Sequence, residues 1–173
     1  MTNDIDRRYP IGTFDPPESY SLESVQQHIE DIENLPAIVE KLTRELPTGW
    51  LKTPYREGGW TGRQLIHHLA DSHINAFIRC KLATTEDWPE ILPYRQGEWA
   101  SQIDHTLEIE FSLSILTGLH KRWSHLLSHL STDDWTNRGY FHPEYGRKQP
   151  LFEVVALYSW HSRHHTGHLK LLA

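Results

Sequence analysis

The sequence has very little cysteine and no long apolar run. One cysteine, Cys80, stands among 173 residues, which excludes an internal disulfide framework and any zinc cluster built on cysteines. We expect Cys80 to be a small core residue. No run of eighteen apolar residues occurs, so no transmembrane helix is predicted. The first residues, MTNDIDRRYPIGTF, lack the apolar region of a signal peptide. These absences predict a cytoplasmic protein with no membrane partner.

Clustered positive charge is also missing. The formal net charge is -6, and no run of Lys and Arg is longer than two residues. Because affinity for phosphate backbones comes from clustered cations, we expect no nucleic-acid partner. Histidine and tryptophan are instead abundant, with 13 and 7 residues. Tryptophan mostly serves packing, whereas neutral imidazole binds divalent metals, so the histidines are the better indication of function.

The spacing of apolar residues predicts four long helices. Pro36 lies within the first and should kink or split it. Thr61 and Gln64 form a T-x-x-Q capping box that starts the second. The expected ranges are 21–46, 61–84, 107–130 and 150–172.

The segments between these helices are rich in proline and glycine. Residues 1–20 read as an extended arm lying over the body of the protein, and 84–99 as a long irregular link. Residues 137–150 form a second link, with a small hairpin expected around 143–146. The prediction is an all-α protein: one four-helix-bundle domain over residues 1–173, with long irregular links in place of tight up-down turns.

Four histidines crowd the last helix, in the segment YSWHSRHHTGHLK at residues 158–170. At 100° per residue, His161 and His165 fall on the apolar side of that helix. His168 lies nearer the edge of this side, and His164 lies at its border. The opposite face, which we expect to meet solvent, holds Ser159, Arg163, Thr166 and Lys170.

Two interpretations of His161 and His165 remain. Each could be a core histidine hydrogen-bonded to a neighbour, since a buried imidazole must be satisfied. Alternatively, residues at i and i+4 are neighbours on a helix face, so the two rings can bind one metal together. A zincin protease is not indicated, because Ser162 stands where H-E-x-x-H needs glutamate.

A metal site in a bundle also needs ligands from a facing helix. The second helix offers three histidines, and helical periodicity does not choose among them. These are His67, His68 and His73. A polar stripe on the same helix, at i, i+4, i+7 and i+11, borders the apolar face and consists of His68, Ser72, Asn75 and Arg79. Such a stripe could form the wall of a polar pocket, although polar stripes on bundle helices are more often solvated.

Several longer segments resemble one family, the DinB/YfiT-like metal-dependent hydrolases, and within it the group of bacillithiol transferases. The resemblance covers essentially the whole chain. The matching segments are RRYPIGTF, TPYREGGWTGRQLIHHLADSHINAFIR, LPYRQGEW, HKRW, RGYFHPEYG and ALYSWHSRHHTGH.

This resemblance implies a four-helix bundle that holds one divalent metal, zinc or nickel, on three histidines. The ligands would be His68, the second histidine of HHLAD, together with His161 and His165. Homodimers are common in the family, so we expect a homodimer that acts on a small-molecule substrate.

Three protein ligands leave an open position, as in catalytic metal sites. That position could hold water or the thiol of a small co-substrate. We therefore expect a metal-dependent hydrolase, with low-molecular-weight-thiol S-transfer and non-enzymatic metal binding as alternatives. His168 could serve as a base or orient a ligand. Candidate pocket residues, chosen from the matching segments, are Tyr55, Arg56, Asn75, Arg79, Arg95, Tyr140 and His142.

Overall fold

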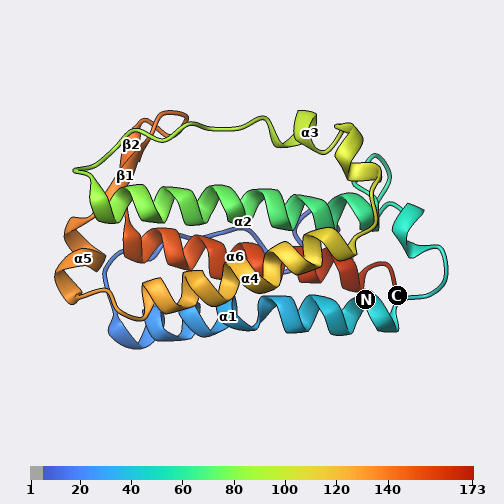
Figure 1. Cartoon of the computed structure of the whole chain (residues 1–173), viewed down its shortest axis with the longest axis horizontal. Coiled ribbons are helices and arrows are strands. Elements are labelled where there is room, and N and C mark those ends of the chain that lie inside the picture. Colours follow the sequence, from blue (N-terminus) through green and yellow to red (C-terminus); the bar gives the residue numbers. More distant parts are fainter. Residues whose placement is uncertain (1–5) are drawn as a thin grey trace.

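A bundle of four long helices dominates the computed structural model, which describes residues 6–173 (Figure 1). The expected helices are confirmed to within a few residues. None of the helices in the described part is long and apolar enough to cross a membrane. The four are α1 (Leu22–Glu45), α2 (Gly62–Thr85), α4 (Glu110–Leu127) and α6 (Leu151–Lys170).

The helices are not arranged as a simple up-down bundle. Helices α1 and α2 each pack against both α4 and α6, so they occupy opposite corners. In Figure 1, α1 and α6 run in one direction and α2 and α4 in the other. The link between the parallel helices α2 and α4 must therefore travel the length of the bundle, and it carries the short helices α3 (Gln96–Trp99) and η2 (Ile103–Thr106).

Helix α1 is continuous through Pro36, so the split that the sequence allowed there does not occur. Proline removes one backbone hydrogen bond, but the residues on both sides hold the helix on the core. Ile32, Leu35 and Val39 are all buried and lie along one face. Tertiary packing therefore outweighs the local penalty.

The remaining links carry small elements at the ends of the bundle. Between α1 and α2 lies η1 (Trp50–Lys52), and between α4 and α6 lies α5 (Thr132–Asn137). The predicted hairpin is confirmed: β1 (Gly139–His142) pairs antiparallel with β2 (Arg147–Pro150). Its turn ends at Gly146, whose φ of 62° suits glycine.

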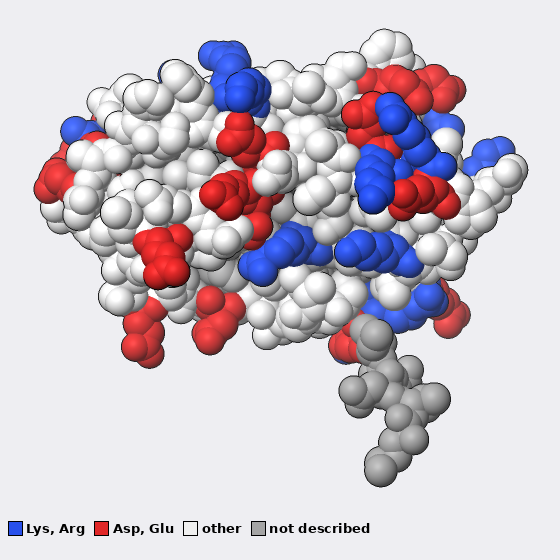
Figure 2. Space-filling model, turned by 90° about the horizontal axis from the view of Figure 1, so that it is seen from below, with Lys and Arg blue, Asp and Glu red and all other residues white. Residues whose placement is uncertain are grey.

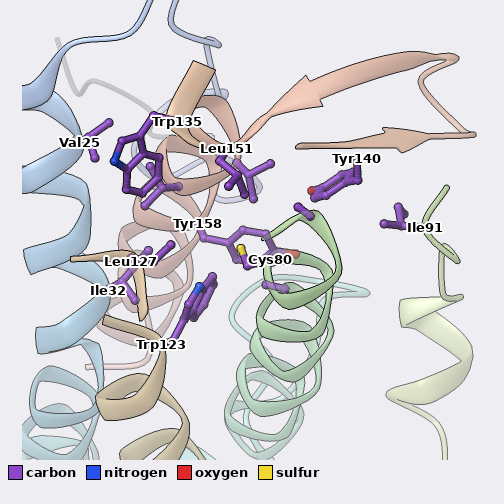
Figure 3. Packing of buried hydrophobic residues seen from close by; sticks show 14 residues of the cluster. Val25, Ile32, Cys80, Ile91, Trp123, Leu127, Trp135, Tyr140, Leu151 and Tyr158 are labelled. Carbon is purple, nitrogen blue, oxygen red and sulfur yellow. The ribbon is translucent and has the colours of Figure 1, made fainter. Parts of the chain in front are cut away.

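The core consists of two apolar clusters stacked along the bundle. One surrounds Trp123 and Tyr158 and includes Cys80, as Figure 3 shows. Burial raises the pKa of the Cys80 thiol to about 12, in keeping with the predicted core role. The other cluster contains Leu69, Leu116 and Leu169. Helices α2, α4 and α6 therefore cross a layer between the clusters, and that layer is filled by histidines.

The surface carries charges of both signs. On the face seen in Figure 2, acidic and basic side chains are interspersed. The expectation that nucleic acid is not a partner stays a prediction.

Candidate metal centre

Three histidines from α2 and α6 meet at the layer between the two apolar clusters. His161 and His165 lie one turn apart on α6, with ring centroids 4.4 Å from each other. The ring of His68 lies 5.5 Å from that of His161 and 4.8 Å from that of His165. Each ring offers one nitrogen such that these atoms all lie within 4.8 Å of one another. Such a set can converge on a single ion.

The chemistry of these three side chains fits a divalent metal. His68 Nε2 is buried and has no hydrogen-bond partner among the described residues, which is costly unless something else satisfies it. Burial, reinforced by neighbouring histidines, lowers the pKa of His68 to about 3 and holds the pKa values of His161 and His165 well below 6.5. All three rings are therefore neutral at pH 7 and have a lone pair to donate.

A cavity of about 470 Å³ opens beside His161 and His165. Its wall combines the N-terminal arm, the segment before α2, one residue of α3 and the last turns of α6. None of the described residues that line it is acidic. They are Arg8, Tyr9, Tyr55, Arg56, Gly58, Gly59, Trp60, Gln96, Trp160, His161, His164, His165 and His168.

The N-terminal arm reaches the cavity because it lies along α6 in the opposite direction, as the blue trace of Figure 1 shows. The ring of Tyr9 lies 6.0 Å from that of His164, and the ring of Phe14 lies 5.9 Å from that of Trp160. The arm residues from 6 to 20 form no helix or strand.

Gly167 lets the arm approach α6 closely. A Cβ added there would lie 2.9 Å from Pro10 Cγ, so Gly167→Ala should displace the arm. We expect trypsin to cut after Arg8 at least about threefold faster in this variant, measured by mass spectrometry, because local opening controls cleavage. The matched control is Gly118→Ala, also within a helix, whose added Cβ meets nothing within 4 Å. It should stabilise the protein by about 1 kcal/mol without changing the cut. Equal cleavage rates in both variants would show that the arm is not held at Gly167.

Of the candidate pocket residues, only Tyr55 and Arg56 line this cavity. Arg79 follows His68 by eleven residues on α2, which places it about 16 Å farther along the helix. Sharing a polar stripe therefore does not bring two residues to one site. The other candidates lie elsewhere: Asn75 donates to Asp71 O, Arg79 donates to Leu92 O, Tyr140 packs in the core, His142 belongs to β1, and Arg95 directly precedes α3.

His168 lines the cavity, but both of its ring nitrogens are engaged. Nδ1 lies 3.2 Å from His165 Nδ1, and Nε2 lies 3.2 Å from the carbonyl oxygen of Arg8. This favours the role of orienting a ligand over that of a base. His164 differs, since its buried Nδ1 has no partner among the described residues, and burial lowers its pKa to about 4.

The face of α6 expected to meet solvent is only half exposed, so the sequence prediction is confirmed for two of its four residues and wrong for the other two. Ser159 and Thr166 are buried, while Arg163 and Lys170 are exposed. Helix α1 lies against this side, and Ser159 Oγ donates to Asp31 Oδ2 at 2.5 Å. Since α6 also contacts α2, it is enclosed on most sides, and a single helix's periodicity cannot reveal that.

Sequence reasoning gave no role to two histidines that lie next to the ligand set, although His73 was among the three histidines that it considered on the second helix. His73 Nε2 lies 3.0 Å from His161 Nδ1, and His73 Nδ1 lies 2.9 Å from His120 Nε2. His120 lies in the third predicted helix, where only the apolar stripe was interpreted, although this residue belongs to the matching segment HKRW. The cavity residues Arg8 and Tyr9 were missed as well, because nothing local places the arm beside α6.

Comparison with known proteins agrees with this architecture. The family model described as the DinB superfamily matches residues 31–169. The chain belongs to the DinB superfamily. Similar proteins include one from Bacillus cereus strain 03BB102 and one from Bacillus thuringiensis subsp. konkukian, both named "putative metal-dependent hydrolase". Each is 44% identical over 167 residues, covering 96% of this chain and 95% of the relative.

A solved structure is also similar to this chain. YfiT from Bacillus subtilis, described as "a probable metal-dependent hydrolase with an unusual four-helix bundle topology", matches with a TM-score of 0.92 and 40% identity. The match covers 97% of this chain and 96% of YfiT. The parallel pair α2 and α4, joined by a link along the bundle, is the feature of this chain that departs from an up-down bundle.

Proposed function

We propose that this DinB-superfamily protein is a metal-dependent hydrolase of small molecules, in which His68, His161 and His165 hold one zinc or nickel ion. The observation that carries the proposal is the buried Nε2 of His68, which has no partner within residues 6–173 and lies beside two neutral imidazoles at an open cavity. A bound ion would act as a Lewis acid on water or a thiol in its open position. The names of the relatives support the same class.

The cavity wall indicates the kind of substrate. Aromatic side chains, including Trp60 and Trp160, offer apolar surface, and two arginines offer positive charge. Arg8 is already paired with Asp6 through two contacts of 3.1 and 3.0 Å. Arg56 has no carboxylate partner among residues 6–173, so its charge remains for a ligand. These features suit a small molecule with an apolar body and one anionic group.

Thiol transfer is the second candidate, and one observation favours it. Hydrolysis usually employs a general base near the water, but no Asp or Glu lines the cavity in the described structure. A thiolate that is stabilised by a metal needs no separate base once it has formed. The same site could therefore join a low-molecular-weight thiol to an electrophile.

Product analysis of the zinc-loaded protein separates the two reactions. For hydrolysis, we expect loss of small aryl esters that carry a carboxylate, with no added thiol. For transfer, we expect conjugates only when a small thiol such as cysteine is present. If the zinc-loaded protein forms neither product in larger amount than the metal-free protein does across the substrate panel, both reactions are contradicted. Metal binding without catalysis would then be the remaining function.

Arg56→Gln tests the contact with the anionic group. We expect KM for a carboxylate-bearing substrate to rise about tenfold, equivalent to about 1.4 kcal/mol, with a neutral analogue unaffected. Arg44→Gln is the control, since Arg44 lies on the exposed end of α1 and pairs with Glu40. If Arg56→Gln raises KM for neutral and anionic substrates equally, the arginine does not read charge.

A further inference from the structure

Each α6 histidine of the candidate metal centre is backed by a second histidine through the same ring atom. His161 Nδ1 lies 3.0 Å from His73 Nε2, and His165 Nδ1 lies 3.2 Å from His168 Nδ1. In both ligands, Nδ1 therefore contacts a neighbouring histidine ring. Nε2 is the nitrogen that remains for an ion in either case, and its one hydrogen-bond contact among the described residues is the long one of 3.5 Å between His161 Nε2 and Ser72 Oγ.

The first contact is the end of a chain of three rings. His120 Nδ1 lies 2.5 Å from the carbonyl oxygen of Ile32, in α1. A carbonyl oxygen only accepts, so His120 Nδ1 must carry the proton. A neutral ring has one N–H, so His120 Nε2 accepts, and the facing Nδ1 of His73 donates across 2.9 Å. His73 Nε2 then accepts from His161 Nδ1–H, which leaves His161 Nε2 as a lone pair.

The direction of this chain depends on neutral rings, and their surroundings favour neutrality. His73 and His120 are both 0% exposed. No hydrogen bond or ion pair of residues 6–173 joins either ring to a carboxylate. An unpaired buried imidazolium would be costly there. The layer between the two apolar clusters therefore holds uncharged imidazoles.

The second chain is shorter and ends on the N-terminal arm. His168 Nε2 lies 3.2 Å from the carbonyl oxygen of Arg8, so Nε2 carries its proton. His168 Nδ1 then accepts from His165 Nδ1–H, and His165 Nε2 is left as a lone pair. Tyr55 stacks on His168, with ring centroids 4.0 Å apart, and fixes the plane of this ring.

We propose that these two histidine chains, each ending on a backbone carbonyl, hold His161 and His165 as Nδ1–H tautomers before any metal arrives. His73, His120 and His168 are positioning residues: they act on the metal through the ligand rings. This proposal rests on the proposed metal site and adds how that site is prepared. Histidine ligands of metals commonly donate their other N–H to a partner that fixes tautomer and orientation. Here the partners are histidines, and the carbonyls set the direction of the protons.

The tautomers can be read directly in the metal-free wild-type protein. Two-bond ¹H–¹⁵N correlation spectra at pH 7.5 distinguish a protonated Nδ1 from a protonated Nε2 in each ring. We expect Nδ1–H for His161, His165, His73 and His120, and Nε2–H for His168. A protonated Nε2 on His161 or His165 would overturn the proposal. This spectrum needs neither a variant nor a bound metal.

Zinc affinity tests whether the first chain matters to the site. His73→Phe removes both contacts of the middle ring, and we expect zinc to bind about 10–100-fold more weakly by chelator competition. His73→Gln keeps one acceptor for His161 and one donor for His120, so it should recover most of the affinity. His125→Phe, at an exposed position on α4, is the control and should match the wild type.

The outcomes separate this proposal from the proposed function. Wild-type zinc affinity in a folded His73→Phe protein would overturn the role of the chain. Failure of the wild-type protein to bind zinc would instead contradict the proposed metal site, and the spectrum of the metal-free protein would still decide the tautomers. If His73→Phe does not fold, that spectrum and the Gln variant carry the test.

Discussion

Replacing His161 by alanine should abolish stoichiometric zinc or nickel, whereas His164→Ala should retain it. His161 supplies one of three ligands, and losing a ligand should cost more than the 10–100-fold that losing a supporting contact costs. The comparison is sharp because the structure holds a second group of three histidines, His164, His165 and His168, that shares His165 with the first. A metal on that second group would be lost in His164→Ala.

The hydrogen bonds favour the first group. In the second, His165 and His168 direct Nδ1 at each other across 3.2 Å, and the other nitrogen of His168 faces the Arg8 carbonyl. Elemental analysis after dialysis measures the metal content, and circular dichroism checks that each variant is folded. Equal metal content in the wild type and in His161→Ala would contradict the assignment of the three ligands. Loss in His164→Ala alone would transfer the site to the second group.

Metal-free protein should lose stability steeply as the pH falls from 7 to 5. Burial lowers the pKa of His68 to about 3 and that of His120 to about 4, whereas in the unfolded chain both return to about 6.5. Below pH 6.5 the unfolded state therefore binds protons that the folded state does not bind. The stabilising effect of these two neutral histidines is present above pH 6.5 and is lost as the pH falls toward their folded pKa values.

Each of these two histidines should contribute about 2 kcal/mol of this loss between pH 7 and pH 5. His73, His161 and His165, whose pKa values are also held well below 6.5 by burial, add to it in the same direction. A domain has only about 5–15 kcal/mol of stability, so acid unfolding near pH 5 is expected.

Urea unfolding at a series of pH values measures this effect. His120→Gln removes one group from the balance and should make the slope shallower by up to about 1.4 kcal/mol per pH unit below pH 6. His125→Gln, at an exposed position, should leave the slope as in the wild type. A flat profile from pH 7 to pH 5 would mean that the histidine layer is already charged or hydrated in the folded protein.

Most of the secondary structure was readable from local patterns. The Thr61 and Gln64 side chains form the capping box that the sequence predicts, and α2 starts beside it. The hairpin turns where proline and glycine indicated. The continuous α1 was not readable, because the cost of Pro36 is local whereas the compensating burial of Ile32 and Val39 comes from partners distant in sequence.

The sequence by itself determined that His161 and His165 share one face of the last helix, since spacing on a single helix is a local property. It did not determine which α2 histidine joins them; that came from family resemblance. Only the tertiary structure decided that His68 meets the pair, that His73 stands behind His161, and that His67 instead contacts Ser112 of α4. All three are buried, so hydrophobic periodicity treats them alike, and their roles depend on which neighbouring helix each one faces. The arm follows the same rule: the Arg8 carbonyl reaches His168, 160 residues away, because the fold lays the arm along α6.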